Sequence, residues 1–238
     1  MRIALLGYGK MGKVIEQIAL DRGHSISFKI DISNQAEREQ ITTENTDVVI
    51  EFSSPSSAYE NLKYCMSKGL KTVSGTTGWL EKRAEIETLC KEKSAAFFYA
   101  SNYSIGVNLF FKLNKQLAQL MKGQNQYEVS TTEIHHTEKL DSPSGTAITL
   151  AEGIMDGLGN KDSWVNQKIA ESNEVPIWSS REGKVPGTHV IKYISDVDEI
   201  EIKHEAKSRQ GFALGAVIAA EWIKDKTGVL GMEQMLGF

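Results

Sequence analysis

The chain opens on Met1-Arg-Ile-Ala-Leu-Leu-Gly-Tyr-Gly-Lys-Met-Gly12, an apolar strand that runs straight into a Gly-x-Gly-x-x-Gly turn. Helical spacing follows over residues 13–22, and a second strand, Ser25 to Ile30, stops at Asp31. Such glycines permit a tight turn and close backbone approach to a pyrophosphate, while an acid after the second strand accepts ribose hydroxyls. A lone glycine turn could be merely structural, but the whole unit predicts dinucleotide binding.

The same alternation continues and predicts a doubly wound parallel α/β sheet. We expect three further strands and two helices, at 47–52, 55–68, 71–74, 80–93 and 95–99. In such sheets ligands lie beyond the carboxyl ends of the strands. Each of the two loops at those ends could also be plain turn chemistry. Their common position favours a cofactor role for Gly75, Thr76 and Thr77 and for Ala100, Ser101, Asn102 and Tyr103.

A change of pattern after residue 104 predicts a second, inserted domain. A long amphipathic helix at 105–122 and a helix at 146–158 accompany four strand-like runs, at 127–134, 175–181, 188–194 and 198–205. Consecutive strands without intervening helices suggest a largely antiparallel sheet of the α+β kind. A final helix at 212–226 is expected to return to the first sheet. The predicted domains are 1–104 with 210–238, for dinucleotide binding, and 105–209, for substrate binding and oligomerisation.

The stretch Glu133-Ile-His-His-Thr-Glu-Lys-Leu-Asp-Ser-Pro-Ser-Gly-Thr-Ala147 crowds titratable groups between a strand and a helix start. Helix N-termini bind anions, and His135, His136 and Lys139 can donate protons and carry positive charge. Backbone N–H groups of Gly145 and Thr146 could take a carboxylate. For an arbitrary histidine pair, one core and one surface residue would be the plainer reading. Adjacent histidines in a strand point to opposite faces, so we expect no metal site.

Composition limits the other function classes. The net charge is -4, with 40% hydrophobic and 24% charged residues, which is ordinary for a soluble globular protein. Without a basic run, nucleic-acid binding is not expected. Neither a signal segment nor a membrane span is apparent, and Cys65 and Cys90 are isolated. The cytoplasm is therefore the predicted location.

These residues resemble the 4-hydroxy-tetrahydrodipicolinate (dihydrodipicolinate) reductase family of lysine and diaminopimelate synthesis. The Glu-x-His-His-x-x-Lys-x-Asp-x-Pro-Ser-Gly-Thr-Ala pattern at 133–147 is highly specific to that family. Supporting matches run nearly end to end, at 7–12, 75–78, 100–108, 180–183, 185–188 and 208–213. The resemblance implies a Rossmann-type domain with an inserted mixed or antiparallel-sheet domain that also builds a homotetramer. It also implies hydride transfer from NADH or NADPH to C4 of a cyclic dicarboxylate, with loss of water.

The resemblance also implies roles for individual residues. His135 would be the general acid/base and Lys139 the proton donor, although the sequence leaves open which of the two protonates the product. His136, Ser144, Gly145 and Thr146 would contact substrate. The remaining implied residues would line the cofactor groove: Gly7, Tyr8, Gly9, Lys10, Met11, Gly12, Asp31, 75–77 and 100–103.

One departure from the family pattern concerns the coenzyme. Some members place an Arg after the ribose-binding acid, where this chain has Ile32. NADH should therefore serve at least as well as NADPH, with Lys10 as the remaining candidate for a phosphate contact. The loop from Arg181 to His189 and Arg209 before the last helix are further candidate contacts.

Two other functions compete with this interpretation. Another dehydrogenase of the same fold class would explain residues 1–104 equally well, but it leaves 133–147 without a reason. A nucleotide-sensing regulator would need a surface for a macromolecular partner, and the sequence offers neither a basic patch nor a DNA-reading helix signature.

Overall fold

The polypeptide forms two compact units, each with its own sheet. The computed structural model describes residues 1–208 and 210–238, so the candidate contact Arg209 lies outside the described residues. The first unit combines Met1–Ile105 with Gln210–Phe238, and the second comprises Gly106–Arg209. Within the described ranges, none of the helices has the length and apolar character needed to cross a membrane.

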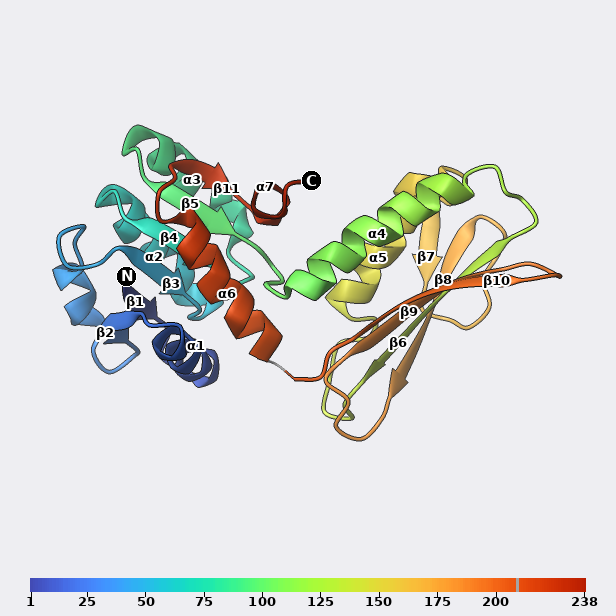
Figure 1. Ribbon diagram of the computed structural model, residues 1–238, viewed down its shortest axis with the longest axis horizontal. Coiled ribbons are helices and arrows are strands. Elements are labelled where there is room, and N and C mark those ends of the chain that lie inside the picture. The colour runs from blue at the N-terminus through green and yellow to red at the C-terminus, as the bar shows by residue number, and fades with distance from the viewer. Residues whose placement is uncertain (209) are drawn as a thin grey trace. The chain divides into compact units, whose positions relative to one another are not determined.

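A six-stranded sheet forms the centre of the first unit, in the order β11-β5-β4-β3-β1-β2 (Figure 1). Every neighbouring pair is parallel. Residues 3–6 and 48–50 are almost completely buried, as expected for strands covered on both faces. The strands are β1 (Arg2–Leu6), β2 (Ser25–Ile30), β3 (Val48–Glu51), β4 (Lys71–Ser74), β5 (Ala96–Tyr99) and β11 (Gly228–Leu230).

Helices cover both faces of this sheet. Figure 1 shows α6 (Gln210–Ile223) beside α1 (Lys10–Asp21), and their small and branched side chains share one core with β1, β3, β4 and β5. On the other face, α2 (Pro55–Ser67) and α3 (Arg83–Glu92) complete a second core. The expected return of the last long helix to the first sheet is thus confirmed. The shorter elements are η1 (Gln35–Gln40), η2 (Leu80–Lys82) and α7 (Met232–Leu236).

The first unit differs from the sequence prediction in its short elements. The 3₁₀ turn η1 was not predicted. The segment 80–93 begins as the 3₁₀ turn η2 and becomes α-helical only at Arg83. Strand β11 was not predicted, because its three residues are too few to show a periodicity; it is recognised only through its parallel pairing with β5.

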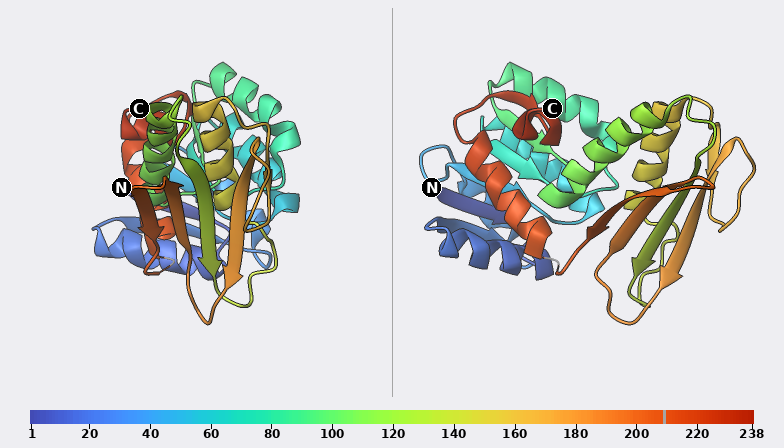
Figure 2. Two further views of the ribbon diagram at one scale, coloured as in Figure 1. Left: turned by 90° about the vertical axis from the view of Figure 1, so that its right-hand side faces the viewer. Right: turned by 45° about the vertical axis from the view of Figure 1, so that its right-hand side comes forward.

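The second unit packs two helices on one face of a five-stranded sheet. Figure 2 shows α4 (Ile105–Met121) and α5 (Gly145–Leu158) lying together against that face. Their apolar stripes meet inward side chains of the strands in a common core that includes Phe110, Leu150, Ile177 and Tyr193. The strands are β6 (Glu128–His135), β7 (Ser163–Val165), β8 (Glu174–Arg181), β9 (Thr188–Ile194) and β10 (Glu199–Glu205).

The second sheet is mixed, within the expected mixed or antiparallel class, although its consecutive strands had suggested a largely antiparallel one. Its order is β10-β9-β6-β8-β7. Pairs β6–β9 and β9–β10 are antiparallel, whereas β6–β8 and β7–β8 are parallel. Strands β8 and β9 follow one another in sequence without pairing, because β6 lies between them. Helix α5 carries the chain back after β6, so β8 enters beside it in the same direction.

Candidate active site

A groove in the first unit lies beyond the carboxyl ends of β1, β2 and β3. It has a volume of about 520 Å³. The glycine turn, the end of β2 and the loop after β3 all contribute to its wall. The lining residues are Gly7, Tyr8, Gly9, Ile30, Asp31, Ile32, Ser33, Gln35, Phe52, Ser53, Ser54, Ser57 and Asn61. Four of the predicted cofactor residues, Gly7, Tyr8, Gly9 and Asp31, are therefore brought together here.

The glycine turn is held against the second strand by backbone hydrogen bonds. The N–H groups of Gly7 and Tyr8 donate to the carbonyl of Ile30 at 2.9 and 3.0 Å. Lys10, Met11 and Gly12 form the first turn of α1, whose N-cap is Gly9. Gly9, the N-cap of α1, lines the groove, and the free amide groups of a helix start favour an anion.

The other predicted cofactor residues follow β4 and β5 and lie beyond the lining of this groove, as far as the described residues show. Thr76 is buried, and its hydroxyl donates to Glu51 Oε1 at 2.9 Å. Tyr103 is also buried, with its hydroxyl donating to the Ser74 carbonyl at 2.7 Å. The Tyr103 phenol therefore belongs to the core, and Thr77 and Ser101 are exposed.

In the second unit, strand β6 places Glu133 and His135 on the same buried face. Alternate residues from Val129 to His135 are buried, as the two-residue period of a strand requires. Sheet register sets His189 of β9 opposite Glu133, and Arg181 of β8 opposite His135. His136 follows the strand and is only partly buried. The two adjacent histidines thus occupy different environments.

Arg181 ties this strand to the loop that carries Lys139. Its guanidinium donates to Glu133 Oε1 at 3.3 and 3.4 Å and to the carbonyls of Lys139 and Asp141 at 3.4 and 2.6 Å. The Lys139 ammonium contacts both carboxylate oxygens of Asp141 at 2.8 Å, and its side chain is 21% exposed. Asp141 is exposed, so this ion pair is of modest strength.

The start of α5 is anchored to the same carboxylate. Ser144 is the N-cap, and its hydroxyl accepts from the Ala147 N–H at 3.2 Å. The Ser144 N–H donates to Glu133 Oε1 at 3.0 Å. Gly145 and Thr146 form the first turn, with Gly145 exposed. These contacts fix the start of α5, where the sequence predicts an anion site.

His189 is expected to make the protein sensitive to acid. Burial, together with the neighbouring His135 imidazole, lowers the pKa of His189 to about 4. Below its ordinary pKa of about 6.5 the unfolded histidine binds a proton that the folded one does not, so stability falls as the pH falls. This group should remove about 2 kcal/mol from the free energy of unfolding between pH 7 and pH 5. Urea titrations of His189→Asn should show a flatter pH dependence, and parallel curves for variant and wild type would contradict the expectation.

Two family models cover both units of the chain. The model described as dihydrodipicolinate reductase, N-terminus, matches residues 1–103, and the one described as dihydrodipicolinate reductase, C-terminus, matches residues 106–236. The chain belongs to the dihydrodipicolinate reductase family.

Relatives in the dihydrodipicolinate reductase family match along nearly the whole chain. A 4-hydroxy-tetrahydrodipicolinate reductase of Christiangramia forsetii is 50% identical over 99% of this chain and 98% of its own length. One of Methanosarcina acetivorans is 33% identical over 99% of this chain and 89% of its own. A dipicolinate-bound dihydrodipicolinate reductase from Paenisporosarcina sp. TG-14 has the same fold, with a TM-score of 0.82, 21% identity and 99% of both chains covered.

The site residues predicted from the sequence did not include Glu133, although the 133–147 motif begins with it. The predicted two-residue period already placed Glu133 and His135 on one face. The side chains of Glu133, His135 and His189 offer possible metal-ligand atoms within 4.8 Å of one another. The sequence analysis had considered only the adjacent pair His135 and His136 and had expected no metal site. The role of Ser53 and Ser54 in the groove was also missed; their signal was the Ser-Ser-Pro sequence after a predicted strand.

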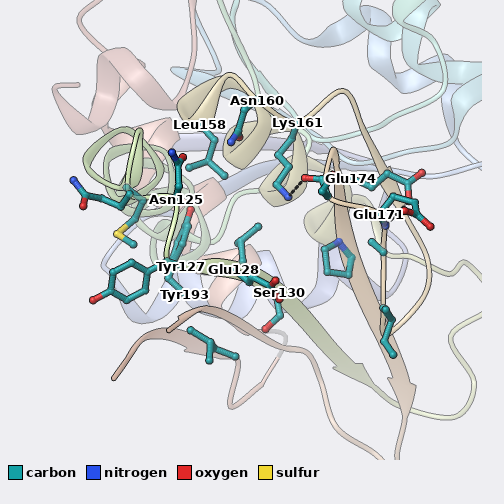
Figure 3. A pocket seen from close by; sticks show the side chains of 18 of the residues that line it. Asn125, Tyr127, Glu128, Ser130, Leu158, Asn160, Lys161, Glu171, Glu174 and Tyr193 are labelled. Atoms are coloured by element: carbon teal, nitrogen blue, oxygen red, sulfur yellow. Dashed lines mark hydrogen bonds between the residues drawn. The ribbon is translucent and has the colours of Figure 1, made fainter. Parts of the chain in front are cut away.

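The second unit also contains a cavity away from Glu133. Its volume is about 470 Å³, and it lies between the α4–β6 loop, the end of α5 and the loop before β8. Figure 3 shows side chains that line it. The Lys161 ammonium crosses it to donate to the Ser172 carbonyl at 2.6 Å. In the described part of the chain its lining shares no residue with the surroundings of Glu133, so it is separate from the candidate site.

Proposed function

We propose that this chain catalyses the NAD(P)H-dependent reduction of 4-hydroxy-tetrahydrodipicolinate to tetrahydrodipicolinate in lysine and diaminopimelate synthesis. The observation that carries the proposal is the 50% identity, along 99% of the chain, to a relative that bears this reductase's name. In this proposal the first domain, 1–104 with 210–238, binds the coenzyme. The second, 105–209, binds the dicarboxylate and supplies the proton.

The groove of the first unit fits the coenzyme in three respects. The α1 start offers backbone amides for a pyrophosphate, the space around Gly9 is open, and Asp31 stands at the end of β2. Hydrogen bonds from the Ser33 hydroxyl and N–H lower the pKa of Asp31, which keeps it ionised for ribose hydroxyls. Bound NAD(P)H supplies the hydride.

Gly7 and Gly9 should fail in different ways when replaced by alanine. Gly7 has φ +98°, and a Cβ there would lie 2.1 Å from the Phe52 carbonyl oxygen, so Gly7→Ala should lose about 3 kcal/mol of stability or more. At Gly9 a Cβ would meet nothing within 4 Å. Gly9→Ala should therefore melt like the wild type but bind NADH at least tenfold more weakly by calorimetry, because the methyl occupies the pyrophosphate's approach. Unchanged NADH affinity in Gly9→Ala would contradict this placement of the coenzyme.

In the second unit, chemistry requires one proton overall, since hydride addition and loss of water leave an electron-rich ring carbon. His135 and Lys139 are the groups proposed to supply it. The two substrate carboxylates would be held by Lys139, His136 and the α5 start at Ser144, Gly145 and Thr146. The partly buried ammonium and the amide-rich helix start support that assignment.

NADH should be used at least as well as NADPH. Ile32 is 91% exposed on the groove wall and offers no positive charge, while the ionised Asp31 repels a 2′-phosphate. Lys10 at the start of α1 is exposed and remains the candidate for a phosphate contact. Ile32→Arg should raise kcat/KM for NADPH relative to NADH by about tenfold, equal to about 1.4 kcal/mol. A wild-type preference for NADPH of tenfold or more would overturn this expectation.

A coupled assay tests the proposed activity. NADH absorbance should fall only when aspartate semialdehyde, pyruvate and a condensing synthase generate the cyclic substrate. Oxidation of NADH without the synthase, or none with it under conditions where a reductase of the family works, would refute the proposal. The homotetramer and the cytoplasmic location stay predictions, and sedimentation velocity tests the first.

A further inference from the structure

Glu133 is a fully buried carboxylate at the centre of the second unit's polar cluster. It is 0% exposed on β6, the middle strand of its sheet. Side chains from three strands and the start of α5 converge on it. We call Glu133, His135, Ser144, Arg181 and His189 the Glu133 cluster. A buried carboxylate is costly unless each oxygen is satisfied, so the partners of its two oxygens indicate what it does.

One oxygen, Oε1, faces only donors that fix the backbone around the substrate loop. The Ser144 N–H donates to it at 3.0 Å and the Arg181 guanidinium at 3.3 Å. The same guanidinium holds the carbonyls of residues 139 and 141. This oxygen therefore links strand β6 to the α5 start and to the Lys139 loop.

The other oxygen, Oε2, faces His135. Its distance to His135 Nδ1 is 3.1 Å, although the angles fall outside those of a well-formed hydrogen bond. Neither atom has another hydrogen-bond partner among the described residues. Two complementary buried atoms at this distance, each otherwise unsatisfied, are most simply a donor and its acceptor. That arrangement requires the proton of a neutral His135 to be on Nδ1, which leaves Nε2 for the substrate.

We propose that Glu133 is a positioning residue that keeps the His135 proton on Nδ1, so that Nε2 is the nitrogen that exchanges a proton with the substrate. The inference rests on the proposed reductase function. It concerns how the imidazole is oriented, whereas the proposed function concerns which reaction occurs. Carboxylates that hold a catalytic imidazole in one tautomer contribute about 10²- to 10⁴-fold to kcat.

The charges around the cluster are consistent with an ionised Glu133. Burial opposes ionisation, but the contact with His135 and the donors of Ser144 outweigh it and hold the pKa of Glu133 well below its ordinary value. The Arg181 guanidinium from β8 and the Ser144 N–H at the start of α5 face Glu133 as donors. His189 from β9 is 3.9 Å from Oε2 and stays neutral near pH 7, as does the more distant His204 of β10.

The same three side chains, Glu133, His135 and His189, are close enough to consider as metal ligands. The ion pair between Arg181 and Glu133 favours the orienting role. The guanidinium already balances the negative charge of the carboxylate, which would otherwise attract a metal cation. The two arrangements make different predictions. A metal would require Nδ1 of His135 without a proton, whereas the orienting role requires the proton there.

The variant Glu133→Gln distinguishes the roles of the two carboxylate oxygens. The amide oxygen can still accept from Ser144 and Arg181, but the amide nitrogen would face Nδ1 as a donor and drive the His135 proton to Nε2. We expect kcat to fall at least 100-fold, with KM for the cyclic substrate within about threefold. Glu138→Gln, an exposed change in the same loop, is the matched control and should keep wild-type kcat.

Nitrogen NMR of ¹⁵N-histidine-labelled protein gives a second readout, whose wild-type part does not depend on whether Glu133→Gln folds. The His135 signals, identified by their loss in His135→Gln, should show the Nδ1–H tautomer in neutral wild-type protein and the Nε2–H tautomer in Glu133→Gln. An Nε2–H tautomer in the wild type, kcat of Glu133→Gln within twofold of wild type, or wild-type activity lost to a chelator and restored by a metal ion would each overturn the inference. An inactive wild type with the Nδ1–H tautomer would instead refute the reductase function alone.

Discussion

His135→Gln is expected to lower kcat by about 10²- to 10⁴-fold, the usual range for loss of a general acid. His135 is 8% exposed and contacts the ionised Glu133, so it is the imidazole that the fold holds in a fixed orientation. Glutamine keeps a polar group of similar reach but cannot deliver a proton. Steady-state kinetics with the coupled substrate measure the loss, and NADH affinity should stay within about threefold because the coenzyme groove lies in the other unit.

His204→Gln is the matched control for this change. His204 lies on β10 outside the Glu133 cluster and is partly buried. The centroid of its ring is 5.9 Å from that of the Phe110 ring. Its variant should keep kcat within about threefold of wild type, the limit we set for an indirect effect. If His135→Gln folds, binds NADH and turns over at the wild-type rate, His135 is not the acid or base.

Lys139→Met should reduce kcat/KM for the cyclic substrate by about 100-fold or more, acting on both parameters. The ammonium is held by Asp141 at 2.8 Å on a loop that Arg181 clamps, so its position is set before substrate arrives. Methionine preserves the length and apolar stem while removing the charge and the proton. The effect on KM reports the lost carboxylate contact, and the effect on kcat reports the lost proton donor.

Lys122→Met controls for the loss of a positive charge. Lys122 is exposed after the end of α4 and belongs to neither proposed binding site. Its kinetics should match the wild type. A Lys139→Met enzyme with unchanged kcat and raised KM would restrict Lys139 to binding and leave His135 as the proton donor; wild-type values for both parameters would remove Lys139 from the site.

The first unit could be predicted in detail because its signals are local. The turn from Gly7 to Gly12, the acid at Asp31 and the alternation of strands and helices each lie within a short stretch of sequence. What the sequence did not give is non-local. Strand β11 becomes recognisable only through its pairing with β5, and the position of β6 between β8 and β9 depends on how α5 returns the chain.

The candidate site followed the same division. His135 and Lys139 stood out as titratable groups beside a helix start, and the loop from Arg181 to His189 was noted as a possible contact. The convergence of Arg181 and His189 on Glu133 required the register of three strands. Glu133 was not predicted as a site residue because a carboxylate in a strand is usually exposed to solvent. Its complete burial in the structure indicates that it interacts with groups inside the protein.

The central claim is that this chain passes a hydride from NAD(P)H to the ring of the cyclic dicarboxylate. The most direct test supplies NADH with both nicotinamide C4 hydrogens replaced by deuterium. The amount of deuterium in the product of the coupled reaction, and its position in the ring, are then measured. One deuterium in tetrahydrodipicolinate, at ring carbon C4, is expected for each NADH oxidised. Product without deuterium, or NADH oxidised without ring reduction, would contradict it.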